Sequence, residues 1–252
     1  MLLSVIPLAQ SNAQSSAPAL NGAARWADSA RVLLDRAVVT DSVSLFTSSA
    51  ALLDKALTAF PNDPLLLHYR AYGLYREAMR ADGGDGMSDA TEASLKRAIE
   101  LLERSVASRP LPETHALLAS CLGALAGTGM INGMRYGSAA GDAGEAARAL
   151  GPQNPRVLLL SGISAWFTPS MWGGGKDKGL ALVQQAVSAF TKDAPARPLP
   201  AWGAAEAYAW LGQMEKERGN VAAARTAYER ALTLEPSYTW VRQVLKPALG
   251  AP

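Results

Sequence analysis

The residue types that most often perform chemistry are few in this chain. Its 252 residues include two histidines, His68 and His115, and one cysteine, Cys121. This set cannot build a Cys/His zinc cage or an intramolecular disulfide, so we expect no metal and no cofactor. Neither histidine has an acidic residue at helical spacing, which favours packing over ligand binding. Cys121 lies in an apolar run, where a thiol is typically an inert core residue.

A glycine-rich segment is the strongest candidate for an anion site. Gly174, Gly175 and Lys176 precede a helix expected from about Asp177. Backbone amides at a helix start, together with a lysine, can bind an anion. However, the upstream glycine and the Ser or Thr of a phosphate-binding P-loop are absent. The alternative, which we favour, is a tight interhelical turn with a solvated lysine.

Acidic residues occur in patterns that indicate exposed helix surfaces. Glu100 lies four residues from Lys96 and Arg104 and three from Arg97, and Glu103 lies in the same segment. Such spacing produces ion pairs on one side of a solvent-facing helix. The chain has no Ser-x-x-Lys, Gly-x-Ser-x-Gly or His-Glu-x-x-His motif. We therefore expect a protein that is not an enzyme.

A repeat in residues 205–238 indicates how the chain is organised. Counting Ala205 as position 1, Leu211, Gly212, Ala224, Tyr228, Ala231 and Pro236 occupy positions 7, 8, 20, 24, 27 and 32. This spacing resembles the tetratricopeptide-repeat (TPR) family. Small residues at positions 8, 20 and 27 let two helices approach closely, and the aromatic residue fills the gap between them. Proline ends the second helix because it cannot continue the hydrogen-bond pattern.

Four further units extend this register toward the N-terminus. They start at Ala30, Pro64, Glu113 and Pro155, with insertions of 15, 8 and 16 residues. Their position 8 is Ala37, Ala71, Ser120 and Gly162, respectively. Glycine and proline mark loops at 81–88, 127–133, 167–176 and 193–200. We predict an all-α, right-handed TPR superhelix of about five helix-turn-helix units over residues 25–252, closed by a capping helix at 238–249.

The N-terminal segment, residues 1–24, has features of a secretory signal. Residues 1–9 are apolar, and Ser11-Asn12-Ala13 resembles a signal-peptidase site. No Lys or Arg precedes Arg25, so we expect the true start to lie upstream; an irregular tail is the alternative. We expect an exported protein, periplasmic or secreted, with a cytoplasmic location as the alternative. No later segment is long and apolar enough to predict a transmembrane helix.

Residues 167–176, Phe-Thr-Pro-Ser-Met-Trp-Gly-Gly-Gly-Lys, resemble an insertion in a group of uncharacterised bacterial TPR proteins. Residues 133–137, 154–156 and 200–203 extend this resemblance. It implies export and no particular activity. A weaker resemblance is to the periplasmic TPR subunits of TRAP-type solute transporters, without a motif specific to them.

In a TPR array, positions 2, 5, 9, 12 and 13 of each first helix face the concave groove. The groove candidates are His68, Tyr72, Tyr75, Arg76, Leu117, Arg156, Ile163, Trp166, Phe167, Gln213 and Lys216. Aromatic and arginine residues are common anchors of binding surfaces. The groove is either open to a partner or covered by the insertions.

These features favour a scaffold or adaptor of the cell envelope that binds a protein or peptide. The alternatives are an accessory subunit of an envelope transport system and a small-ligand-binding protein with an aromatic pocket near Trp166. With 24 basic and 22 acidic residues, the net charge of +2 predicts no nucleic-acid partner.

Overall fold

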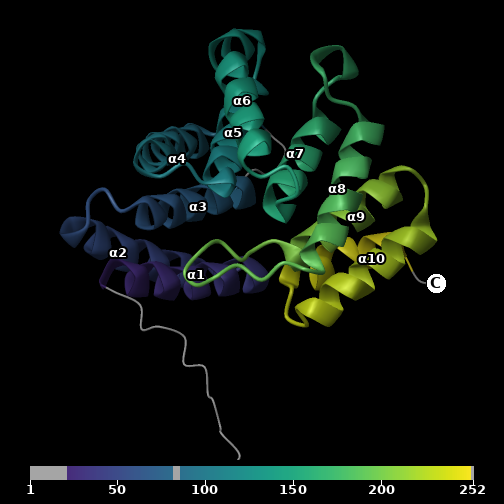
Figure 1. Cartoon of the computed structure of the whole chain (residues 1–252). Helices are drawn as coiled ribbons and strands as arrows, with labels where there is room; N and C mark the ends of the chain where they lie inside the picture. The colour runs from purple at the N-terminus through teal and green to yellow at the C-terminus, as the bar shows by residue number, and fades with distance from the viewer. Residues whose placement is uncertain (1–21, 82–85, 251–252) are drawn as a thin grey trace, which may run out of the picture.

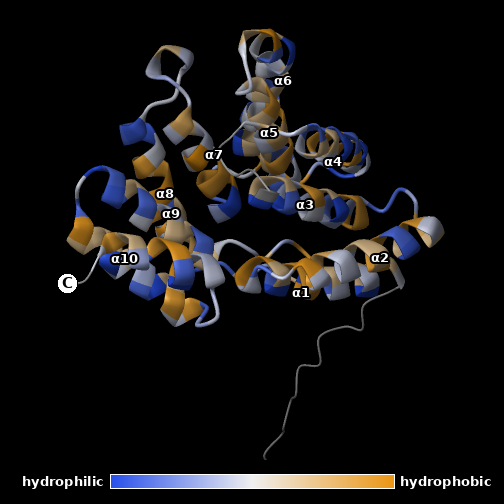
Figure 2. Cartoon of the chain, turned by 180° about the vertical axis from the view of Figure 1, so that it is seen from behind, coloured by the Kyte–Doolittle hydropathy of each residue, from blue (hydrophilic) through white to orange (hydrophobic). Residues whose placement is uncertain are grey.

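The computed structural model describes residues 22–81 and 86–250, and in them ten α-helices form five hairpins (Figure 1). The helices are α1 (Gly22–Thr40), α2 (Val43–Ala59), α3 (Pro64–Ala81), α4 (Asp89–Ser108), α5 (Pro112–Ala126), α6 (Met130–Leu150), α7 (Pro155–Phe167), α8 (Lys176–Phe190), α9 (Ala204–Glu217) and α10 (Val221–Leu234). Consecutive hairpins pack side by side. The all-α repeat solenoid predicted from the sequence is confirmed. Figure 2 shows hydrophobic residues concentrated in α5 and α7, which lie in the middle of the array.

Helix starts follow from local capping chemistry. The side chains of Ser42 and Ser88 accept hydrogen bonds from the third amide of α2 and α4, and Asn154 accepts from two amides of α7. These bonds satisfy amides that have no partner within the helix. Pro112 and Pro155 stand at the starts of α5 and α7, where the missing N–H costs nothing.

Small residues bring the two helices of each hairpin together, as the register predicts. Ala37 and Ala71 are fully buried at position 8. A Cβ on Gly162 would lie 2.8 Å from Val183, and a Cβ on Gly212 would lie 2.3 Å from the ring of Tyr228. Such distances are too short for any real side chain, so these positions require glycine unless the helices move apart.

The first helix is longer than predicted. It begins at Gly22, eight residues before Ala30. The added turns are held because Ala27 is fully buried and Trp26 is half-buried against the core. Packing thus extends the helix beyond the repeat. The segment 1–24, expected to be a leader, lies outside the described residues up to position 21.

One other predicted boundary was wrong. Residues 127–133 were expected to form a loop, but α6 begins at Met130 and the amide of Gly133 donates a helical hydrogen bond to Gly129. The turn therefore needs only residues 127–129.

The capping segment expected at 238–249 is helical. Residues Trp240–Leu245 form a π-helix, and a 3-10 turn, Pro247–Leu249, follows. Pro247 cannot continue the preceding helix because it lacks an amide donor.

The structure contains no helix, among the residues that it describes, of the length and hydrophobicity needed to cross a bilayer. The loop 193–200 is confirmed as non-helical, and the insertion after α7 folds into a short 3-10 helix, Ser170–Trp172.

Prediction: Gly212→Ala should lower the free energy of unfolding by about 1–3 kcal/mol, because the new methyl group overlaps the Tyr228 ring. Gly137→Ala is the matched control, since Gly137 lies in α6 with open space around it. That change should stabilise the protein by about 0.5–1 kcal/mol through helix propensity. Equal urea-denaturation midpoints for the two variants would contradict the close contact between α9 and α10.

Candidate functional site

The connection between α8 and α9 crosses the inner face of the solenoid, the face lined by the first helix of each hairpin. We call residues 191–203 the strap; Figure 1 shows it running along α1. The hydroxyl of Tyr69 in α3 donates a 2.6 Å hydrogen bond to the carbonyl of Pro198. The ring of Trp202 stacks on Tyr72 with centroids 4.9 Å apart. The strap is thus attached to α3 along its length.

Two arginine–aspartate pairs fix the strap at its other contacts. Arg156 in α7 donates to both carboxylate oxygens of Asp193, at 3.1 and 2.5 Å. Arg197 in the strap donates to both oxygens of Asp28 in α1. The Arg197 guanidinium holds the pKa of Asp28 below its usual value. Paired hydrogen bonds of this kind fix orientation as well as charge, so the strap has a defined position.

The strap covers one half of the predicted groove. The side chains of His68, Tyr72, Leu117, Arg156 and Trp166 are buried, each with at most 4% of its surface exposed. The groove is covered at these residues, because the strap and the chain around it fill the space that a ligand would occupy. They are part of the core. Of the two alternatives left open by the sequence, an open and a covered groove, the burial of these five side chains therefore fits the covered one.

The other half of the inner face stays partly accessible. Tyr75, Arg76, Ile163, Gln213 and Lys216 are half-buried there. They come from the later positions of their helices, away from the strap. The Arg76 guanidinium lies 2.5 Å from the Glu206 carboxylate, which joins α3 directly to α9.

Three aromatic side chains form a row at the edge of this accessible half. Phe167, the most exposed at 66%, meets the ring of Trp210 edge to face at 6.0 Å. Trp210 in turn lies 5.5 Å from Trp240 in the C-terminal segment. The sequence register missed both tryptophans because Trp210 falls at a packing position and Trp240 lies beyond the repeats. We call Phe167, Trp210 and Trp240 the aromatic row.

The glycine loop is a closed turn and not an open anion site. The amides of Gly173, Gly174 and Gly175 already donate to the carbonyls of Ser170, Pro169 and Ala165. These amides cannot also donate to an anion at full strength. A Cβ on Gly174 would lie 2.1 Å from the carbonyl oxygen of Thr168, so the turn requires glycine there.

Lys176 is also engaged by the chain. Its ammonium lies 5.1 Å from the centre of the Trp166 ring and 3.2 Å from the carboxylate of Glu217. The Lys176 side chain is 60% exposed, as expected for a solvated lysine, and its ion pair links the start of α8 to the end of α9. Its position above Trp166 also fills the space where the sequence suggested an aromatic ligand pocket.

His68 is held as a packed, neutral side chain. Its Nδ1 shares a 3.0 Å hydrogen bond with the Thr114 hydroxyl. Burial, with a smaller effect from Arg156, lowers the pKa of His68 to about 3. The imidazole is therefore uncharged at neutral pH, in agreement with the packing predicted from the sequence. Among the described residues, no three His, Cys, Asp or Glu side chains converge as a metal site.

Asp35 in α1 is the side chain with the most unusual protonation in this region. Burial raises its pKa to about 6, although the guanidinium of Arg31, 3.5 Å away, opposes the shift. One carboxylate oxygen is buried without a hydrogen-bond partner. Its carboxyl is therefore partly protonated near pH 6, where an ordinary aspartate is ionised.

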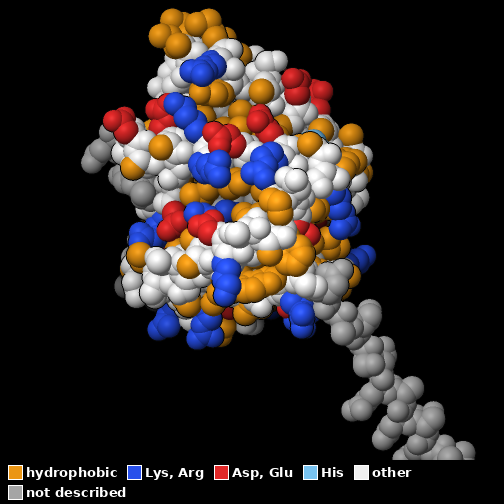
Figure 3. Space-filling model, turned by 90° about the vertical axis from the view of Figure 1, so that its left-hand side faces the viewer, with side chains coloured by type: hydrophobic (Ala, Val, Ile, Leu, Met, Phe, Trp, Pro, Cys, Tyr) orange, Lys and Arg blue, Asp and Glu red, His pale blue; other side chains and the backbone are white. Residues whose placement is uncertain are grey.

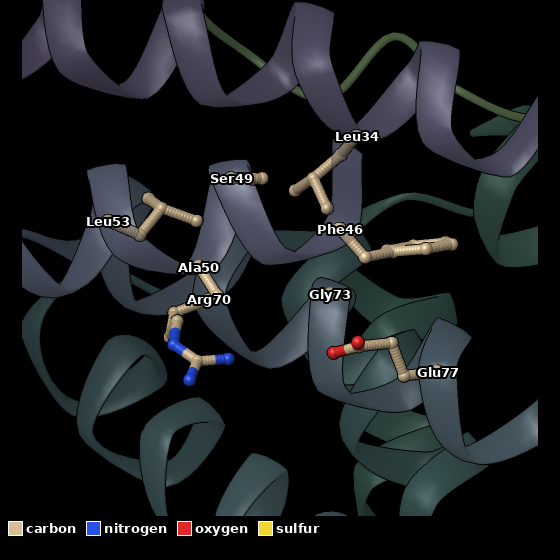
Figure 4. A pocket seen from close by; sticks show the side chains of 8 residues that line it. All are labelled: Leu34, Phe46, Ser49, Ala50, Leu53, Arg70, Gly73 and Glu77. Carbon is tan, nitrogen blue, oxygen red and sulfur yellow. The ribbon is translucent and has the colours of Figure 1, made fainter. Parts of the chain in front are cut away.

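Two hollows lie away from the inner face. The one in Figure 4, about 160 Å³, lies between α1, α2 and α3, with Leu34, Phe46 and Glu77 among its lining residues. It is too narrow for a water molecule. The second is lined by polar residues such as Arg70 and Arg97, between α3 and α4. Neither hollow is lined by Trp166 or Phe167.

Comparison with solved structures identifies the fold as TPR-like. The chain aligns with a thermophilic TPR protein from Thermus thermophilus at a TM-score of 0.62 and 18% identity, covering 90% of this chain and 98% of that one. It aligns with Cut9 of the APC/C hetero-tetramer Cut9–Hcn1 at 0.52 and 16% identity, over 90% of this chain and 38% of that one.

A third similar structure is the HusA haemophore from Porphyromonas gingivalis, with a TM-score of 0.58 and 21% identity. The match covers 78% of this chain and 94% of that one. At these identities the likeness concerns the fold. No family model and no curated protein matches the chain.

Prediction: Trp166→Ala should lower the free energy of unfolding by about 3–5 kcal/mol, because a large buried aromatic leaves a cavity. The neighbouring Phe167→Ala is the control and should change stability far less, since two thirds of that side chain is in solvent. Chemical denaturation of both variants measures the difference. A small effect at Trp166 would show that the inner face is open at this point.

Prediction: Asp35→Asn should gain stability relative to the wild type as pH rises from about 4 to about 7. The folded carboxyl has a pKa of about 6 against an ordinary value of 3.8, so the folded state holds its proton more tightly. The wild type therefore loses this contribution as pH rises through the folded pKa. The measurement is the difference in denaturation midpoint between the two proteins at each pH. A difference that does not vary with pH would contradict the raised pKa.

Proposed function

We propose that this protein is a non-catalytic interaction scaffold that binds a segment of a partner protein beside the strap, along the aromatic row. The TPR-like fold supports a general role in protein interaction. The binding surface is argued from the site, since a fold alone does not specify a partner.

The observation that carries the proposal is the exposure of Phe167 next to a filled groove. The strap occupies the half of the inner face where an extended peptide would otherwise lie. Beside it, Phe167 is 66% exposed yet held against Trp210. A ring that is positioned in advance loses little conformational entropy on binding, which favours it as an anchor. Arg76, Gln213 and Lys216 supply polar groups near the accessible half, as is typical of interface rims.

The chemistry of the site also supports binding over catalysis. His68 is buried, neutral and bonded to Thr114, and Cys121 is buried with a raised pKa. A buried thiol that resists ionisation is a poor nucleophile. The small-ligand alternative near Trp166 has less support, because Lys176 lies over that ring. An accessory role in an envelope transport system remains a special case of the same proposal.

We place this scaffold in the cell envelope, as periplasmic or secreted, on the strength of the apolar residues 1–9 and the Ser11-Asn12-Ala13 sequence. An exported scaffold would meet its partner among envelope proteins. The partner search therefore belongs in that fraction.

Prediction: a photoreactive phenylalanine analogue at position 167 should crosslink to a protein partner in the envelope fraction of the source cells. The same residue at position 32 is the control, because Val32 is also exposed, at 51%, but lies on α1. Phe167→Ala should then weaken binding of the purified partner by about 2 kcal/mol or more while leaving the fold intact. Equal crosslinking at both positions, or unchanged affinity, would contradict the aromatic row as the site. Recovery of the chain only from the cytoplasm would contradict the location.

A further inference from the structure

Two hairpin turns carry large apolar side chains that have no contact with the core. The turn between α5 and α6 presents Met130, Ile131 and Met134, exposed at 82%, 76% and 74%. The turn between α7 and α8 presents Met171 and Trp172, exposed at 81% and 74%. We call these five residues the apolar tips. Exposed side chains of this size that are grouped together mark an interaction site more often than isolated ones do.

The apolar tips project beyond the packed body of the protein. Of the 21 residues of α6, only Ala143 and Ala147 are buried, and Tyr136 and Ala140 are partly buried against the core, so the turns before Tyr136 extend past it. The 3-10 helix Ser170–Trp172 has no buried residue. Figures 1 and 2 show both turns at the same end of the molecule. Figure 3, which shows one face of the molecule, has a group of hydrophobic side chains at the outermost point of this end.

Local geometry directs the apolar side chains of the first tip outward together. Met130 and Met134 are four residues apart on α6, and Ile131 is adjacent, so the three share one surface of the first turns. A helix surface of this kind, with hydrophobic residues facing away from the protein, has no partner within the described chain. These hydrophobic side chains leave water only if an external partner covers them.

The backbone of the second tip is suited to a water-poor environment. The amides of Trp172, Gly173, Gly174 and Gly175 all donate to carbonyls within the turn or at the end of α7. The ammonium of Lys178 donates to the Gly173 carbonyl at 2.6 Å. Unpaired backbone groups are what exclude most loops from a bilayer, and these four amides are paired within the chain.

The net charge beside the apolar tips is positive. Lys176 is balanced by Glu217. Two nearby cations have no carboxylate partner among the described residues: Arg135 in α6, and Lys178, which donates to the Gly173 carbonyl. The nearest acid at the second tip, Asp177, is paired with Arg218. The near-zero net charge of the whole chain conceals this local excess of cations. Cations beside apolar side chains complement anionic lipid headgroups.

We propose that the apolar tips bind the surface of an anionic lipid bilayer, with their side chains in the headgroup and upper acyl region. Tryptophan is enriched at that depth because its ring is apolar while its N–H can bond to water. Two separate projecting turns also fit a deformable bilayer better than a single protein groove of fixed shape. The attachment is peripheral, and it leaves the aromatic row for the proposed protein partner.

The experiment measures sedimentation of the purified protein with phosphatidylcholine vesicles that contain or lack phosphatidylglycerol. We expect binding to the anionic vesicles that weakens with salt. The double variant Ile131→Ser/Trp172→Ser should lower the partition coefficient by roughly tenfold or more. The matched control is Val32→Ser/Val244→Ser, which changes two residues exposed at 51% and 54% outside the tips and should bind as the wild type does.

A second measurement reports the depth of the tips. Lipid brominated on its acyl chains should quench part of the tryptophan emission in the wild type, and the Trp172→Phe variant should lose that part. No binding to anionic vesicles, or equal binding by the tip variant, would overturn the proposal. The proposal would also be overturned if the wild type is a dimer and the tip variant is a monomer, because the tips would then bind a second copy of the chain. It would likewise be overturned if a crosslinker at position 131 captures a protein and the chain does not bind vesicles. Absence of vesicle binding contradicts the lipid-binding proposal alone. Absence of partner crosslinking at Phe167 contradicts the proposed protein-binding function alone.

Discussion

The buried guanidinium of Arg156 is the constraint on which the inner face depends. Only 1% of the residue is exposed, and its charge is met by Asp193 in the strap. Removing the partner of a buried charge typically costs about 3–5 kcal/mol, since the charge is left without water or a counterion. Because Asp193 is the first acid after α8, the chain must turn onto the inner face at that point. Trp202 then reaches Tyr72, and the strap closes over α3.

The repeat could be predicted from sequence because its signals are local. The small residues that permit helix contact, Ala71 and Gly212 among them, occur at fixed spacing within one hairpin. The strap could not be predicted in this way. Tyr69 and Pro198 are 129 residues apart, and Asp28 and Arg197 are 169 apart. No periodicity links such pairs, so the sequence shows that an insertion exists without showing where it folds.

The same limit applies to the candidate site. Register placed Trp166 and Phe167 together as neighbours on one surface, but the structure buries the first and exposes the second. The difference arises because α8 packs closely on Trp166, where a Cβ on Gly179 would lie 2.8 Å from the Trp166 amide nitrogen, whereas Phe167 is the last residue of α7. The apolar tips were missed for a related reason: Met130 and Ile131 were assigned to a loop, and hydrophobic residues in a loop give no helical pattern to detect.

The strap also explains why exposed apolar residues appear at the ends of the hairpins and not in the groove. A solenoid with an open inner face offers its largest apolar surface there, and a partner must cover it. Here the chain covers half of that surface itself through Trp202, Pro198 and the residues beneath them. Among the described residues, the large hydrophobic side chains that are more than 60% exposed all lie in the aromatic row or the apolar tips. Phe167 belongs to the first and Met171 to the second, although only a few residues separate them. The turn between them changes the direction of the chain, so one hairpin can contribute to a protein site and to a lipid-facing surface at once.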